Sequence, residues 1–104
     1  MIPQKTIEDL LKKHNKLEKD LSSGNIDKKN FAEKSKEYSD LNEIIEDAKN
    51  YISFEKNKLE LEKILSDQKS DEDLKNMAEL ELNDLKINHE KNEKKLKLFL
   101  IPKD

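Results

Sequence analysis

The sequence predicts an all-α fold: an elongated antiparallel bundle or coiled coil of three helices, with one long central helix and a two-helix tip. Charged residues make up 43% of the 104 positions and hydrophobic residues 33%, with one glycine and two prolines to interrupt helices. Acidic and basic residues alternate, which suits exposed helix faces stabilised by pairs three and four residues apart. Apolar residues recur at helical spacing, and no segment shows the alternation of a half-buried strand.

The first helix is expected over about residues 3–22. Pro3 suits its first turn, because the N–H group that proline lacks has no partner within the helix there. Thr6, with Asp9 three residues later, offers an alternative capping start. Gly24, the only glycine, is expected to end the helix in the left-handed conformation. The apolar face consists of Ile7, Leu10, Leu11, His14, Leu17 and Leu21.

The second helix is expected over about residues 28–66, with Asp27 as its N-cap. Neither glycine nor proline interrupts this stretch, which would be about 60 Å long at about 1.5 Å per residue. Its two neighbouring apolar stripes are Phe31, Tyr38, Ile45, Ile52 and Leu59, and Ile44, Tyr51, Phe54, Leu61 and Leu65. A face this wide can contact two partner helices. Glu55 and Glu62 interrupt the first stripe, so the packing should thin toward the far end.

The third helix is expected over about residues 71–99. Ser70 and Asp73 have the spacing of a capping box, and Pro102 stops the helix near Phe99. Short connections make neighbouring helices antiparallel. The first helix and the C-terminal half of the third should therefore lie beside the N-terminal half of the second. The remainder, about residues 49–82, should extend as a two-stranded rod.

The composition argues against an enzyme and against a cofactor site. No cysteine is present for a disulfide or a cysteine-based zinc site, and a single glycine cannot build a phosphate-binding loop. No apolar run approaches the roughly 20 residues of a membrane span, and the first residues lack the apolar core of a secretory signal. We expect no catalytic residues, no metal or other cofactor, no small-molecule substrate, no membrane contact and a cytoplasmic location.

The two histidines are the first candidate site. His14 and His89 both fall on apolar stripes, and no HxxxH or HExxH spacing suggests a metal site. The antiparallel layout places them at a similar level, together with Asn92. One hypothesis is a polar layer in the core that fixes the helix register. The alternative is two independent, half-exposed histidines.

Apolar residues outside the main stripes are the second candidate site. Ile64 and Leu80 lie off those stripes near the far end of the rod, so they are candidates for contact with a partner. The cluster Lys94, Lys95 and Lys97 could contact phosphate, but the acidic residues around it favour an ordinary solvated helix face.

Three sequence blocks resemble the start of the bacterial peptide chain release factor 1 family. Residues 31–41 (FAEKSKEYSDL) are similar to its S-[RK]-E-Y-x-x-L block, and residues 71–82 (DEDLKNMAELEL) to its D-x-E-[ML]-[RK]-x-M-A-x-x-E-[LI] block. Residues 98–104 (LFLIPKD) are similar to the L-L-L-P-K-D segment that leads into the second domain. The related factor 2 lacks this Leu-Pro-Lys-Asp ending. The order and spacing of the blocks agree with factor 1.

The resemblance implies that residues 1–104 form a single N-terminal helical domain of a factor about three times as long, which terminates translation at UAA and UAG codons. The family's codon-reading Pro-x-Thr loop and its Gly-Gly-Gln loop, which promotes peptidyl-tRNA hydrolysis, do not occur here. The implied partners are the ribosome, at the stalk base of the large subunit, and the GTPase release factor. The acidic, arginine-free composition suits limited rRNA contact. The alternative is a coiled-coil spacer or adaptor that binds another protein.

Overall fold

Four helices form an elongated, two-armed domain. The structure, a computed structural model, describes residues 1–102; there it contains no strand, and its helices are α1 (Gln4–Ser22), α2 (Lys28–Asn42), α3 (Ile45–Ser66) and α4 (Glu72–Leu100). The domain measures 61 × 31 × 20 Å, with a radius of gyration of 18.4 Å. A compact chain of this length would have a radius of gyration of roughly 13 Å. The predicted all-α, elongated antiparallel class is confirmed.

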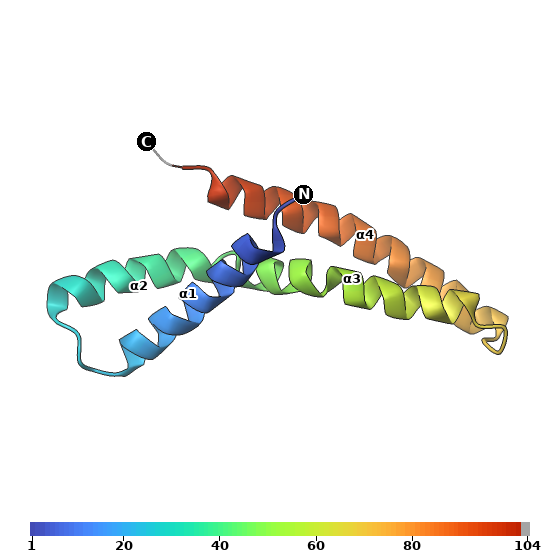
Figure 1. The fold of residues 1–104 in the computed structure, drawn as a ribbon, viewed down its shortest axis with the longest axis horizontal. Coiled ribbons are helices and arrows are strands. Elements are labelled where there is room, and N and C mark those ends of the chain that lie inside the picture. The colour runs from blue at the N-terminus through green and yellow to red at the C-terminus, as the bar shows by residue number, and fades with distance from the viewer. Residues whose placement is uncertain (103–104) are drawn as a thin grey trace.

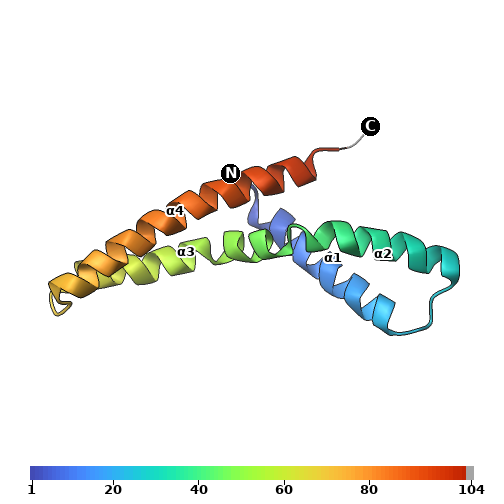
Figure 2. The ribbon, with the colours of Figure 1, turned by 180° about the vertical axis from the view of Figure 1, so that it is seen from behind.

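One arm is the α1–α2 pair and the other is the α3–α4 pair (Figure 1). The helices α3 and α4 meet at the tip and separate toward the middle of the molecule, where α1 begins. The view from behind shows the same arrangement, with α2 and α3 following one another along the long axis (Figure 2). The second arm is the two-stranded rod that the sequence predicted.

The single helix predicted over residues 28–66 is wrong in one respect, because it is divided between α2 and α3. Ile44 has φ −118° and ψ 3°, and its N–H donates to the Leu41 carbonyl at 3.1 Å, one residue nearer than in an α-helix. No glycine or proline marks the break. Its physical reason is a change of partner: α2 packs on α1, whereas α3 packs chiefly on α4. The axis bends where one partner replaces the other.

The helix ends largely follow the sequence signals. Asp27 caps α2 by accepting a 2.8 Å bond from the Asn30 N–H, and Gly24 follows α1 with φ 74°. The alternative start at Thr6 is wrong, because α1 already begins after Pro3. The capping box predicted at residue 70 is also wrong: the Asp71 carboxylate accepts a 2.7 Å bond from the Leu74 N–H and caps α4. A carboxylate one residue further along reaches the free N–H group directly.

The buried core lies where the two arms meet. We call it the junction core, and its members are Ile2, Ile7, Leu17, Leu41, Ile44, Ala48 and Leu96. Ile7 and Leu96 are fully buried, and no charged side chain is buried within residues 1–102. The α4 backbone does not pack along α2 as predicted; its C-terminal end diverges, and side chains such as Leu96 bridge the space.

The α3–α4 rod is packed thinly beyond the junction core. Among the described residues near the tip, only Ala78 is a buried hydrophobic residue, while Leu59, Leu74 and Met77 remain exposed. This agrees with the predicted thinning of the packing toward the far end. The junction core therefore supplies most of the hydrophobic stabilisation of the domain.

Candidate functional site

The candidate functional site is a set of surfaces around the junction core. One of them is a groove of about 480 Å³ between α1, the end of α2 and the end of α4, which we call the junction groove. Its apolar residues are Leu10, Leu41, Ile44, Leu98, Phe99 and Ile101, and its charged residues are Lys13, Glu37, Asp40, Glu43 and Lys95. The groove exists because α4 diverges from α2 at this end. An apolar floor with a charged rim suits an apolar side chain of a protein partner.

Some of the charged residues of this groove form two ion pairs. Lys13 on α1 pairs with Glu37 on α2, and Lys95 on α4 pairs with Asp47 on α3, with 3.5 Å between Nζ and Oδ2. Each pair joins two different helices. The rim charges are therefore partly satisfied within the domain and help to set how the arms meet.

An aromatic cluster lies on the other side of the junction core. The His89 ring of α4 stacks on the rings of Tyr51 and Phe54 of α3, with centroid separations of 4.7 and 3.7 Å and interplanar angles of 20° and 16°. Tyr51 and Phe54 are three residues apart, so they project from one side of α3 toward α4. The Tyr51 hydroxyl accepts a 2.9 Å bond from the Ile2 N–H, which ties the start of the chain to the cluster.

Glu93 connects this cluster to its surroundings through charge. Its carboxylate lies 2.8 Å from Lys97 Nζ, 3.2 Å from the Met1 amino nitrogen and 3.9 Å from His89 Nε2. The hydrogen bond from Lys97, and then that from the amino group, lowers the pKa of Glu93, while Glu93 raises the pKa of Lys97. A general acid at neutral pH needs the opposite shift of a carboxyl group. The arrangement is suited to ionic cross-linking.

The structure places the two histidines in different surroundings. The His14 ring stacks on Tyr38 at a centroid separation of 4.7 Å, and its Nε2 lies 2.5 Å from Asn42 Oδ1, so both partners belong to α2. His89 instead contacts α3, and it lines a groove of about 190 Å³ together with Asn92. Both rings are partly exposed. His89 and Asn92 thus lie in the same groove, whereas His14 lies apart from them and contacts α2. This corresponds to the alternative of two independent histidines.

The aromatic partners of both histidines were not recognised from the sequence. The sequence pattern places Tyr38, Tyr51 and Phe54 only on apolar stripes. The available signal was that each histidine also falls on an apolar stripe, where a flat ring is a favourable neighbour. His89 Nδ1 is buried without a hydrogen-bond partner in the described part of the chain.

The two predicted partner-contact residues differ in exposure. Leu80 on α4 is 68% exposed. Ile64 on α3 is partly buried and lines a shallow groove of about 510 Å³ with Leu61 and Leu85. Leu80 is the more accessible of the two.

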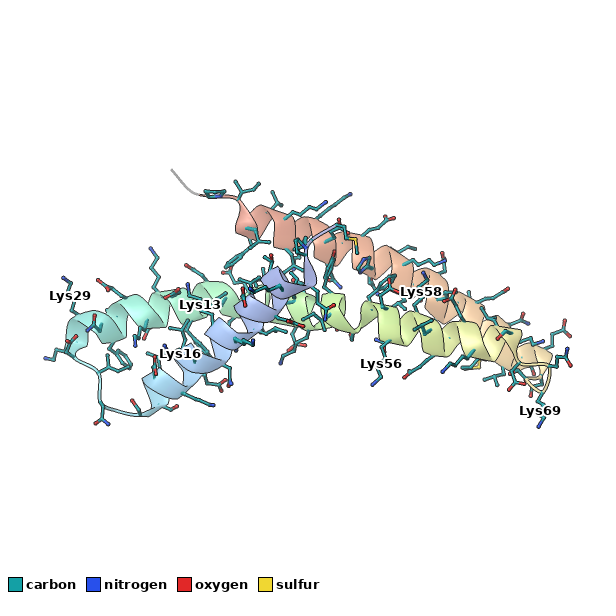
Figure 3. All side chains as sticks on the ribbon, viewed as in Figure 1. Lys13, Lys16, Lys29, Lys56, Lys58 and Lys69 are labelled. Carbon is teal, nitrogen blue, oxygen red and sulfur yellow. The ribbon has the colours of Figure 1, made fainter. Side chains whose placement is uncertain are left out.

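Lysines are spread over the whole molecule. Figure 3 labels Lys13, Lys16, Lys29, Lys56, Lys58 and Lys69, which project from α1, the start of α2, α3 and the tip. In the lysine cluster at residues 94–97, Lys95 and Lys97 pair with Asp47 and Glu93. The charge distribution therefore resembles the solvated helix face that the surrounding acidic residues favoured.

Two further searches of residues 1–102 bear on the function classes. No three histidine or acidic side chains there are grouped as metal ligands. None of the four helices combines the length and the apolar character that crossing a membrane requires.

The chain is similar to several known proteins. A family model described as the PCRF domain matches residues 10–104. Peptide chain release factor 1 of Pelagibacter ubique (strain HTCC1062) is 68% identical over 104 residues, which are 100% of this chain and 29% of that protein. The protein of the same name from Wolbachia pipientis subsp. Culex pipiens (strain wPip) is 40% identical over 103 residues, 97% of this chain and 28% of that protein. No solved structure matches.

The matches confirm the resemblance to release factor 1 that the three sequence blocks predicted. The protein of that name from Orientia tsutsugamushi (strain Boryong) is 38% identical over 95 residues, 91% of this chain and 26% of that protein. The chain thus spans between 26% and 29% of the length of these relatives.

Proposed function

The chain belongs to the PCRF domain family, and on that basis we propose that it is the helical interaction domain of a release factor that terminates translation. The observation that carries the proposal is the 68% identity to a Peptide chain release factor 1 over all 104 residues. The three sequence blocks support the same assignment, since they are in the order and spacing of factor 1.

In this proposal, the domain binds partners and positions the parent factor, and other parts of that factor carry out the chemistry. Reading of UAA and UAG and hydrolysis of peptidyl-tRNA belong to loops of the factor that this sequence lacks, since it contains neither a Pro-x-Thr nor a Gly-Gly-Gln segment. The domain itself is not an enzyme and uses no cofactor.

The proposed partners are the stalk base of the large ribosomal subunit and the GTPase release factor, in the cytoplasm. The junction groove supports contact with protein, because it combines an apolar floor with a charged rim. The net charge of −3 and the spread of the lysines along a 61 Å domain support limited rRNA contact.

A domain replacement tests the proposal. The matching segment of the Pelagibacter ubique factor is replaced by residues 1–104, and peptide release is measured on ribosomes programmed with UAA, UAG or UGA. We expect release at UAA and UAG within about threefold of the unmodified factor, a difference below about 1 kcal/mol. The isolated chain should release no more peptide than a reaction without factor. Release by the isolated chain, or an inactive but folded chimera, would contradict the proposal.

A second chimera distinguishes an interaction domain from a spacer. In it, an unrelated antiparallel helix pair of similar length replaces the domain. If the domain makes specific contacts, this chimera should be recycled from ribosomes by the GTPase factor more slowly than the first. Equal recycling of the two chimeras would favour the spacer alternative.

A further inference from the structure

Besides the residues that face α3, α4 carries a heptad pattern along its outer face. Its positions alternate in steps of three and four, as in the seam of a coiled coil. We call it the outer seam, and its members are Met77, Leu80, Asp84, Ile87, Lys91, Lys94, Leu98 and Ile101, the last being the C-cap of α4. All eight are exposed, and the five apolar members are between 45% and 70% exposed.

Most of the outer seam faces away from the rest of the domain. Residues that face α3, such as Ala78 and Leu96, are centred about 150° around the helix from it, at 100° per residue. In both ribbon views, α4 forms the upper edge of the molecule, and no other helix lies beyond it (Figures 1 and 2). No other helix of the described chain packs along the seam, and its last two members, Leu98 and Ile101, also border the junction groove.

We propose that the outer seam binds the outer seam of a second copy of this chain, in an antiparallel pair with its two-fold axis near the level of residue 89. Positions whose numbers add up to 178 then face one another. Met77 faces Ile101 of the second copy, Leu80 faces its Leu98, and Asp84 faces its Lys94. Apolar layers close both ends of the seam, and an opposite-charge layer lies inside each of them.

Charge selects this orientation and register. A parallel pair would place Asp84 on Asp84, Lys91 on Lys91 and Lys94 on Lys94, and like charges at an interface are unfavourable. Shifting the antiparallel register by one heptad faces Lys91 with Lys94 in one direction. In the other direction, it faces Leu80 with Lys91. In the proposed register, Lys91 faces Ile87, which can pack on the lysine methylene groups.

The expected dimer is weak. The seam from Met77 to Ile101 is about 36 Å long at about 1.5 Å per residue, and one helix from each copy contributes to it. Such a contact is smaller than a standard interface, so we expect a dissociation constant on the order of 100 μM. The pairing is a property of this chain and does not depend on its proposed role in termination.

Sedimentation equilibrium of the 104-residue chain, between about 10 μM and about 1 mM at low salt, tests the pairing. The wild type should show a monomer–dimer equilibrium. D84K and K94D should each weaken it at least about tenfold, because each places two like-charge layers in the pair. An equimolar mixture of the two variants should dimerise as strongly as the wild type, since both layers then join opposite charges.

Matched controls make the same charge changes outside the seam. E79K and K86D alter exposed residues of α4 that are not seam positions, and they should leave the equilibrium unchanged within about twofold. Circular dichroism checks that every variant remains helical. A wild type that stays monomeric to about 1 mM would overturn the proposal. So would variants D84K and K94D that dimerise like the controls, or a mixture of them that stays monomeric.

Discussion

Substitution of Leu96 by alanine should lower the free energy of unfolding by about 3 kcal/mol. Leu96 is fully buried in the junction core and packs beside Ile7, Leu41 and Ile44. Losing its three outer carbon atoms removes about 2.4 kcal/mol of burial free energy, at about 0.8 kcal/mol per carbon. The cavity left behind adds to this, within a measured range of about 2–5 kcal/mol for such sites. Collapse toward the neighbouring junction groove limits the cavity, so the lower half of the range applies.

Urea unfolding followed by circular dichroism measures this loss, at a protein concentration of about 10 μM, where most of the proposed dimer is dissociated. The matched control is Leu98→Ala, two residues along the same helix, because Leu98 is 70% exposed. Its effect should stay within about 0.5 kcal/mol. A loss below about 1 kcal/mol for Leu96→Ala, or equal losses for the two variants, would refute the role assigned to the junction core.

Three further predictions concern the helix ends and charges. Asp71→Ala should reduce the free energy of unfolding by about 1 kcal/mol, whereas Asp71→Asn, which keeps an acceptor oxygen, should lose less; equal losses would contradict the cap. Gly24→Ala should lose about 1 kcal/mol of unfolding free energy and Gly24→Asn less, because φ is +74° there. No atom lies within 4 Å of a Cβ added at this position, so the loss comes from the backbone; an unchanged midpoint for Gly24→Ala would contradict this argument. The folded-state pKa of Glu93 is lowered, so its contribution is complete above pH 4.5 and lost as pH falls through the folded value. Wild type should thus be more stable than Glu93→Gln at pH 7, and thermal melts should converge in acid; a constant difference would contradict the ion cluster.

The sequence predicts the helices well because each has a periodic apolar face and definite ends. Asp27, Gly24 and Pro102 act on the backbone within one turn, so their effects can be inferred locally. The break at Ile44 has no such local cause. It depends on which helix packs against each half of residues 28–66, and that is decided by contacts between distant parts of the chain. Periodicity alone describes one continuous helix.

The candidate site was less predictable for the same reason. The level of a residue along an antiparallel pair can be inferred from loop positions, and His89 and Asn92 do line one groove. The expectation that His14 lies at that level requires α1 and the end of α4 to pack side by side. In the structure these helices diverge, and His14 contacts α2 instead. A small difference in direction at the junction core thus separates side chains that a straight bundle would bring together.

The uneven packing gives the two ends of the α3–α4 arm different mechanical properties. At the junction core, Leu96 and Ala48 are fully buried, and pairs such as Lys95–Asp47 connect the helices. Among the described residues near the tip, only Ala78 is a buried hydrophobic residue. Local opening costs least where few apolar contacts are lost, so the tip can adjust to a partner while the junction core keeps its geometry.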